Sequence, residues 1–277
     1  MVTTHPPRSP ADRRAAARAQ AEQTAAEQTR RQRRTRTAVG AAVLAAVLLV
    51  GAVVWFVLSR GGSDVEGISQ LPDGIDVPSV SDDHGGISFG ASGEAGSTSG
   101  DDAVRVDLYV DFLCPGCGAF EDVNGADLEA LRADGTATVV LHTISFLDGR
   151  SDGSSYSTRA AAAFSYVAEE APEAAYDFQV ALFDHQPAEG EPAPDDARLE
   201  QIAEQAGVPE TVADGISDQR YRDFVGALTQ VAFGDPALLD AQGRFTTPTV
   251  LVDGTVFAGD WSTPGALRAA VEAAAAS

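Results

Sequence analysis

The chain has 277 residues, 44% of them hydrophobic, with 41 acidic residues against 19 arginines and no lysine, for a net charge of −22. This length and composition fit one or two globular domains. Residues 1–36 hold nine Arg and three acidic residues, so the negative charge lies in the rest of the chain. A strongly acidic body argues against binding of nucleic acid, which needs cationic surface.

Residues 1–36 form an Arg-rich tail, and residues 37–59 are predicted to cross a membrane. Ala38–Leu58 is a run of 21 residues without charge, about the length that a helix needs to span hydrocarbon. Five Arg lie within residues 30–36, whereas Arg60 is the only Arg between the run and Arg105, so the positive-inside rule predicts a cytoplasmic tail and an extracytoplasmic remainder. A cleaved signal peptide is the alternative, but its apolar core would be shorter. We therefore expect a single-pass anchor in the cell membrane.

Residues 60–102 are rich in Gly, Ser and Asp and nearly lack aromatic residues. Such a composition cannot bury a core and predicts a flexible acidic linker. Within this range, Gly86–Gly90 is compatible with a short first strand of the folded domain, which we place over residues 103–277.

The predicted domain opens with a strand, a Cys-x-x-Cys motif and a helix. Val104–Phe112 is rich in β-branched and aromatic residues, as strands are. After Cys114-Pro115-Gly116-Cys117, residues 118–133 carry apolar side chains at helical spacing. A second apolar run, Thr136–Phe146, follows. A strand–helix–strand crossover of this length predicts that the two strands are parallel.

Residues 151–243 are predicted as a helical insertion. Breaks that contain Pro or Gly separate its four helical patterns. These patterns cover residues 156–169, 173–184, 195–206 and 218–233.

The sequence after the insertion predicts a hairpin and a last helix. Thr249–Val252 and Thr255–Ala258 are joined by Asp253-Gly254, a strong signal for a two-residue hairpin turn. We expect the last helix to have Thr263 as its N-cap and Pro264 at its first position.

Cys114 and Cys117 are the only cysteines, too few for a structural zinc site of four ligands. A Cys-x-x-Cys at the start of a helix brings both sulfurs within disulfide reach, and the helix N-terminus stabilises a thiolate. We predict Cys114 as the attacking thiolate of low pKa and Cys117 as the less exposed, resolving thiol. A merely structural disulfide or adventitious metal binding is the alternative for the motif alone.

Two separated segments resemble the DsbA-like thiol–disulfide oxidoreductases of the thioredoxin superfamily. They are Val110–Cys117, continued by Phe120-Glu121, and Thr246–Gly254. The resemblance covers about residues 86–277, and it implies an α/β thioredoxin-like fold with a helical insertion.

The resemblance also implies which residues form the site. Pro248 would be a catalytic cis-proline lying against the sulfurs, and Thr247 would offer its backbone to a substrate peptide. Pro115 and Gly116, between the two cysteines, are expected to contact substrate with Thr247. No metal or organic cofactor is expected.

One position departs from the family pattern. Relatives often carry a buried acid six residues before the first cysteine, as the proton acceptor for the resolving thiol, but here that residue is Leu108. Asp107, Asp111 and Glu121 lie nearby in sequence, and none is an obvious replacement. His142 is predicted to be solvent-facing or hydrogen-bonded rather than catalytic, on the ground that no partner lies near it.

The leading functional prediction is extracytoplasmic thiol–disulfide exchange that oxidises cysteines of exported proteins. The family implies reoxidation by a membrane quinone-linked partner. Two alternatives stay open: a membrane-tethered disulfide reductase with the same fold, and a non-enzymatic thioredoxin-like binding or sensor module.

Overall fold

A computed structural model describes residues 70–188, 191–240 and 243–277, all of which belong to one folded unit, Val65–Ser277. The predicted tail (1–36) and transmembrane helix (37–59) lie outside the described residues. Within the described ranges, no helix has both the length and the apolar character needed to span a membrane.

A five-stranded mixed sheet in the order β1-β3-β2-β4-β5 lies at the centre of this unit. β2 and β3 are parallel, as predicted, and the three other pairings are antiparallel. β3 is buried along its whole length, as expected of a strand covered on both faces. The strands are β1 Ile87–Phe89, β2 Val104–Val110, β3 Ala137–Thr143, β4 Thr249–Val252 and β5 Thr255–Val256.

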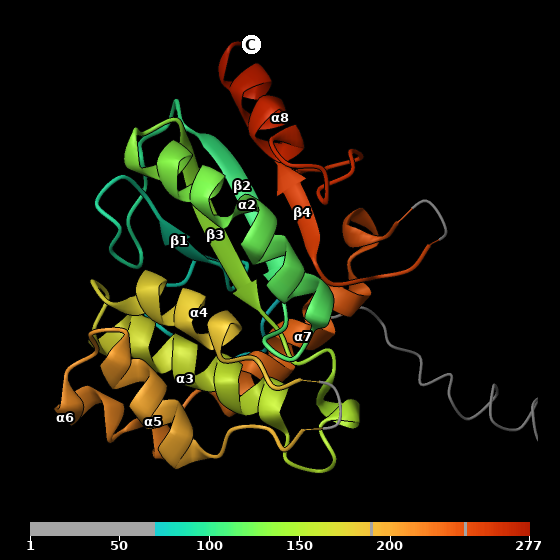
Figure 1. Ribbon diagram of the computed structural model, residues 1–277. Helices are drawn as coiled ribbons and strands as arrows, with labels where there is room; N and C mark the ends of the chain where they lie inside the picture. The colour runs from blue at the N-terminus through green and yellow to red at the C-terminus, as the bar shows by residue number, and fades with distance from the viewer. Residues whose placement is uncertain (1–69, 189–190, 241–242) are drawn as a thin grey trace, which may run out of the picture. The chain divides into compact units, whose positions relative to one another are not determined.

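Helices surround the sheet, and most of them lie in the predicted insertion between β3 and β4. α2 crosses in front of β2 and β3 and contacts α8 (Figure 1). α3, α4 and α5 pack on one another beside the sheet, and α7 contacts both α3 and β3. The α-helices are α2 Pro115–Ala133, α3 Tyr156–Glu170, α4 Ala175–Asp184, α5 Asp196–Gln205, α6 Glu210–Ala213, α7 Arg222–Gly234 and α8 Ala266–Ala275. The short 3-10 helices are η1 Asp148–Arg150, η2 Ile216–Asp218 and η3 Pro236–Leu238. The α/β architecture with a helical insertion is therefore confirmed.

The prediction of a flexible linker over residues 60–102 is wrong for the described part, residues 70–102. β1 pairs with β3, and Ile87 and Phe89 are fully buried. The Phe89 ring packs against the Phe164 and Tyr176 rings, at centroid distances of 6.3 and 5.3 Å. The polar residues that suggested disorder instead form turns, since Asp82 accepts a hydrogen bond from Gly86 N at 2.8 Å.

The start of the last helix is also corrected. α8 begins at Ala266, with Gly265 as its N-cap at φ 78°. Thr263 N instead donates to Asp260 O at 3.1 Å in a preceding turn. Thr263 and Pro264 therefore lie before the helix, because the left-handed conformation at Gly265 redirects the chain.

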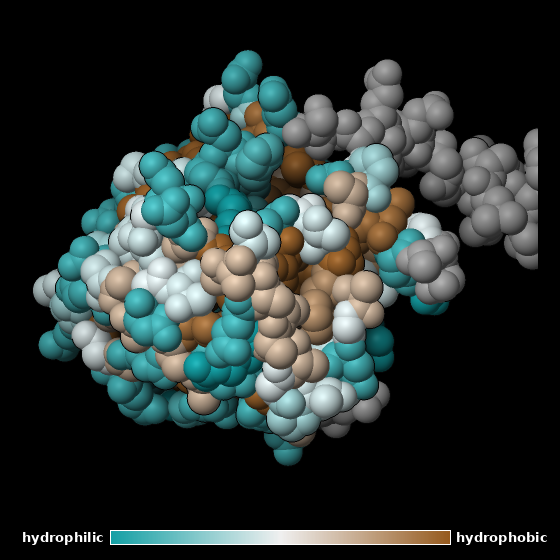
Figure 2. Space-filling view, turned by 90° about the horizontal axis from the view of Figure 1, so that it is seen from above, coloured by the Kyte–Doolittle hydropathy of each residue, from teal (hydrophilic) through white to brown (hydrophobic). Residues whose placement is uncertain are grey.

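The predicted hairpin turn is confirmed, because Asp253 and Gly254 both have positive φ, at 46° and 74°. The helix predicted over 218–233 begins later, at Arg222, because Gln219 adopts a left-handed conformation at φ 53°. Figure 2 shows how the surface is divided on the face seen from above, where hydrophobic side chains gather around a central hollow bordered by hydrophilic ones.

Candidate active site

The two cysteines lie at the start of α2, shortly after the end of β2. Cys114 is the N-cap of α2, in an extended conformation, and Pro115 takes the first helical position, where its missing N–H leaves no helical bond unmade. Cys117 N donates to Cys114 O at 2.9 Å, which closes the first turn. Both side chains are free thiols. Cys114 is 8% exposed and Cys117 is 0% exposed, so the order of exposure agrees with the prediction.

The two thiols have opposite pKa shifts. A hydrogen bond from the Cys117 thiol lowers the pKa of Cys114 to about 6. Burial opposes this shift, while hydrogen bonds from the backbone N–H groups of Cys117 and Gly116 add to it. Burial raises the pKa of Cys117 well above its usual value, and the neighbouring negative charge adds to the rise. Cys114 is therefore the thiolate near neutral pH, while Cys117 keeps its proton.

The loop before β4 meets the sulfurs. β4 pairs directly with β2, with Thr249 opposite Tyr109, so the residues that precede β4 reach the level of the Cys-x-x-Cys turn. The Thr247–Pro248 peptide bond is cis, and the Cys114 thiol donates to Thr247 O at 3.4 Å.

Gly116 marks how closely the two segments approach. A Cβ atom placed on Gly116 would lie 3.4 Å from Pro248 Cδ, 3.5 Å from Thr247 O and 3.6 Å from Cys114 Sγ. The structure thus brings all the predicted site residues together around the Cys114 sulfur.

A buried carboxyl group also lies at this site. Asp111 is fully buried, and its two oxygens accept hydrogen bonds from Leu113 N and Leu147 N, each at 2.7 Å. Burial raises the pKa of Asp111 to about 6, the two backbone bonds oppose the rise, and the Cys114 charge adds to it. Its charge in turn contributes to the raised pKa of Cys117. From the sequence, Asp111 was no obvious replacement for the buried acid that relatives carry six residues before the first cysteine. In the structure it is the carboxyl group coupled electrostatically to both sulfurs.

The other sequence candidates are engaged elsewhere. Asp107 pairs with Arg105 at 2.7 Å and with His142 Nε2 at 2.9 Å, and the His142 ring stacks on Tyr109 at 4.2 Å between centroids. His142 is therefore buried and hydrogen-bonded. This confirms the second of the two predicted states, but the expectation that no partner lies near His142 is wrong. Glu121 accepts a hydrogen bond from Gln179 at 3.1 Å.

Gln186, in the connection after α4, is a site residue that no sequence pattern indicated. Its Nε2 donates to Phe112 O at 2.9 Å and to Cys114 O at 3.0 Å. One amide group from the helical insertion thus ties down two carbonyl groups of the segment that carries Cys114. As to metals, no set of three or more His, Cys, Asp or Glu among the described residues is arranged to hold an ion.

Comparisons with known proteins agree with this geometry. A sequence model of the family described as Thioredoxin matches residues 96–273. The reduced form of the disulfide bond oxidoreductase DsbG from Mycobacterium tuberculosis is 37% identical, with a TM-score of 0.51 over 63% of this chain and 84% of that one. Oxidised DsbA from the same organism is 34% identical, with a TM-score of 0.55 over 69% of this chain and 93% of that one.

A curated relative of another kind matches a shorter segment. The serine/threonine-protein kinase PknE of Mycobacterium tuberculosis is 36% identical over 112 residues, which are 39% of this chain. The match spans only about a fifth of the kinase's length, 20%.

Proposed function

Because the chain belongs to the thioredoxin family, among the DsbA-like thiol–disulfide oxidoreductases, we propose that it oxidises cysteines of exported proteins through Cys114 and Cys117. One observation carries this proposal: the first turn of α2 holds two unequal thiols, of which the outer has a pKa lowered to about 6 and the inner is buried with a raised pKa.

The unequal thiols support oxidation of the substrate over its reduction. A substrate thiolate would attack the Cys114 sulfur of the disulfide, the S–S bond would break, and Cys117 would leave and take up a proton. A second substrate thiolate would then attack the substrate sulfur of the mixed disulfide and release Cys114 as a thiolate. Two electrons thus pass from the substrate to the pair. A leaving thiol of low pKa favours the second step, in which Cys114 is released.

The remaining site residues take supporting roles in this proposal. Thr247 would pair its main chain with the substrate segment, while Pro115 and Gly116 contact it from the other side of the sulfur. Pro248 would be part of the catalytic constellation, beside Gly116. Asp111 would accept or return the proton that Cys117 exchanges, because its carboxyl is the buried group coupled to that thiol.

The test is oxidation of a reduced, unfolded protein by oxidised residues 61–277, followed by counting free thiols. The wild-type protein should consume substrate thiols, and Cys114→Ser should abolish the reaction. Cys117→Ser, with Cys114 first converted to a mixed disulfide with 5-thio-2-nitrobenzoate, should form a mixed disulfide with a substrate that has one cysteine, as thionitrobenzoate leaves. Activity retained in Cys114→Ser would overturn the proposal. A measured reduction potential near the roughly −270 mV of thioredoxin, rather than the roughly −120 mV of DsbA, would favour the reductase alternative.

The proposed location rests on the sequence. The uncharged run Ala38–Leu58 and the Arg-rich residues 1–36 support an anchor with the catalytic domain outside the cytoplasm, where disulfides persist. A membrane quinone-linked partner would then reoxidise the pair. Added protease should digest the catalytic domain on intact cells stripped of their wall; protection until lysis would contradict this location.

A second candidate function is a binding or sensor module, supported by the 112-residue match to a kinase. It predicts no exchange activity and a Cys114 pKa near the usual 8.5, with partner binding retained in Cys114→Ser. The two candidates are therefore separated by the same thiol count.

A further inference from the structure

A buried hydroxyl group of α3 lies beside the Asp111 carboxyl. Ser157, in the first turn of this helix, is fully buried, as Asp111 is. Among the described residues, no group has hydrogen-bond geometry to Ser157 Oγ. The hydroxyl nevertheless acts on the carboxyl: burial raises the pKa of Asp111 to about 6, and Ser157 opposes this rise. A buried polar side chain nearly always has a partner, so this hydroxyl group calls for a functional reason.

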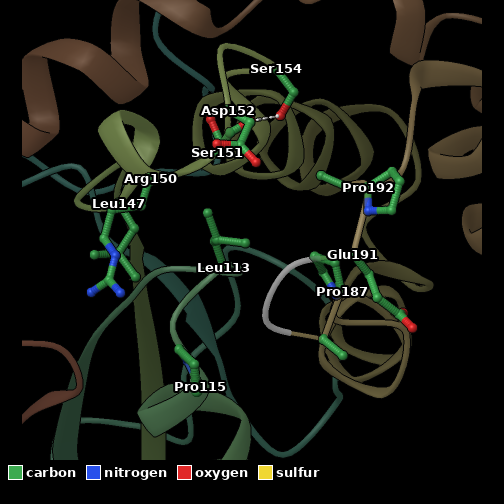
Figure 3. A pocket seen from close by; sticks show the side chains of 12 residues that line it. Leu113, Pro115, Leu147, Arg150, Ser151, Asp152, Ser154, Pro187, Glu191 and Pro192 are labelled. Carbon is green, nitrogen blue, oxygen red and sulfur yellow. Dashed lines mark hydrogen bonds between the residues drawn. The ribbon is translucent and has the colours of Figure 1, made fainter.

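Two consecutive residues after β3 hold the first turn of α3 near Asp111. Leu147 N donates to Asp111 Oδ2 at 2.7 Å. The next residue, Asp148, accepts hydrogen bonds from Thr158 N at 3.0 Å and from the Thr158 hydroxyl. Figure 3 shows the segment that Leu147 opens, which leads from the end of β3 into α3. Because Ser157 directly precedes Thr158, these bonds fix its position next to the carboxyl.

The bonds that Asp111 already makes suit only its ionised form. Its two oxygens accept hydrogen bonds from Leu113 N and Leu147 N, each at 2.7 Å, and a backbone N–H has no lone pair with which to accept one. When the carboxyl is protonated, its O–H needs an acceptor, because a buried donor without one is destabilising. A hydroxyl group both donates and accepts. By turning about its Cβ–Oγ bond, Ser157 can donate to the carboxylate or accept from the carboxylic acid.

Three other titratable groups face the same carboxyl. They are Cys114 and Cys117 of α2 and Tyr156 of α3. Tyr156 is fully buried, and burial raises the pKa of its hydroxyl, so this group keeps its proton near neutral pH. The charge of Asp111 adds to that rise, whereas Ser157 favours the ionised carboxyl, as a hydrogen-bond donor does. Of the two hydroxyl groups on this turn of α3, Ser157 is therefore the one suited to pair with the carboxyl.

We propose that Ser157 is the positioning residue for the proton that Cys117 exchanges, because its hydroxyl group pairs with the Asp111 carboxyl in both protonation states. This rests on the proposed function, in which Asp111 accepts and returns that proton. When a mixed disulfide at Cys114 is resolved, Cys117 passes its proton to Asp111 and its sulfur bonds to the Cys114 sulfur. The other thiol leaves as a thiolate with the electron pair of the broken S–S bond. Ser157 donates to the carboxylate before this step and accepts from the carboxylic acid after it.

The experiment follows the reduced full chain as it reacts with dithiobis(nitrobenzoate), which reports the two sulfurs separately in one trace. The Cys114 thiolate releases the first thionitrobenzoate, and Cys117 releases the second as it resolves the mixed disulfide. The second phase should become faster as the pH rises and Asp111 ionises. Its midpoint should lie at or below about pH 6, because the Cys114 charge that adds to the Asp111 pKa is absent from the mixed disulfide. The first phase follows Cys114 and is the internal control.

Ser157→Ala should raise the midpoint of the second phase by about 0.7 pH unit, and so slow that phase about fivefold below the midpoint. The midpoint rises because the hydrogen bond to the ionised carboxyl is the stronger of the two that are lost. The first phase should not change. The matched control is Ser165→Ala on the same helix, which removes an equally buried hydroxyl group that donates to Ala161 O at 2.8 Å. It should leave both phases as in wild type.

A second background tests whether the serine acts through the carboxyl. In Asp111→Asn, the further change Ser157→Ala should have no effect on the second phase. A wild-type midpoint in Ser157→Ala, or an equal slowing with and without the carboxyl, would overturn the inference while exchange itself stands. A shift found in Tyr156→Phe instead would assign the role to Tyr156 and would also overturn it. If wild type releases no second thionitrobenzoate, the proposed function falls, and this inference falls with it.

Discussion

Cys114 and Cys117 are the same side chain one helical turn apart, and their surroundings give them opposite acidities. The difference comes from position: Cys114 caps α2 and receives hydrogen bonds, whereas Cys117 is sealed inside the first turn. The largest contribution to the lowered pKa of Cys114 is the hydrogen bond from the Cys117 thiol. The two sulfurs thus depend on each other before any disulfide forms.

The Cys114 thiolate should form with a midpoint near pH 6, followed by its absorbance at 240 nm. Because its pKa is lowered, the thiolate is present above that pH and is lost as the pH falls through it. Cys117→Ala removes the hydrogen bond that contributes most, so the midpoint should move up toward 8.5. Cys114→Ser, as control, should show no step below pH 8. An unchanged midpoint in Cys117→Ala would refute this account.

Asp111 should make the reduced protein less stable as the pH rises. Its pKa of about 6 in the folded state exceeds the roughly 3.9 of an unfolded chain. The stability linked to this group is therefore complete below about pH 4 and is lost as the pH rises through about 6.

Asp111→Asn tests this linkage. Thermal unfolding of the reduced protein should show that the free energy of unfolding of wild type falls by up to about 3 kcal/mol between pH 4 and 7. Asp111→Asn should not show this fall. The control is Asp102→Asn in an exposed turn, which should keep the wild-type slope. Equal slopes in wild type and Asp111→Asn would contradict the prediction.

At this scale, the sequence was sufficient for the redox pair but not for its electrostatic partners. Cys-x-x-Cys at a strand–helix boundary is a local pattern, so Cys114 and Cys117 could be found from spacing alone. The role of Asp111 depends on Leu147, 36 residues away, and that of Gln186 on carbonyl groups 72 and 74 residues away. No local pattern encodes contacts of that separation.

At the scale of the elements, α2 is held at its N-terminal end by a group from outside the sheet. Gln186 follows α4 and donates to Phe112 O and Cys114 O. Periodicity predicted α4 and α5 well, because each buries an apolar face. α3 is buried on all sides over Tyr156–Ser165. Periodicity failed at ends fixed by left-handed residues, such as Gly265 before α8.

Gln186→Leu should destabilise the protein by about 1–3 kcal/mol in urea unfolding, because two carbonyl groups lose their donor. Gln186→Glu should also raise the Cys114 pKa, since it places a negative charge at the N-terminus of α2. Absorbance at 240 nm measures that shift. Gln230→Leu, on an exposed position of α7, is the control for the first change. If Gln186→Leu is as stable as wild type, the two hydrogen bonds of Gln186 do not stabilise the start of α2.

At the scale of the whole molecule, the folded unit begins earlier than its composition suggests. Residues 70–102 are poor in apolar residues, but three of those that they contain are buried: Ile87, Phe89 and Ala95. The short strand suggested within Gly86–Gly90 is present as β1, Ile87–Phe89, but the average composition of the segment around it predicted a linker. The parallel pair β2–β3 could be predicted because an obligatory crossover helix lies between them.

A chain that begins at residue 103 should therefore fold poorly. Removing Ile87 from the core costs about 2–5 kcal/mol and removing Phe89 about 3–5 kcal/mol, comparable with the roughly 5–15 kcal/mol that stabilises a typical domain. A chain that begins at residue 65 is the control. Circular dichroism melts should be cooperative for the longer chain and broad or absent for the shorter. Two equally cooperative melts would restore the boundary at residue 103.

Because Cys117 is fully buried, its reaction with an external reagent would report local opening of the first turn of α2. In the native protein an alkylating reagent should add once, at the outer sulfur, and mass spectrometry would count one adduct. A second adduct requires the turn to open and then appears at the opening rate or in proportion to the opened population. The delay between the first and the second adduct would measure, without a denaturant, how often the first turn of α2 opens.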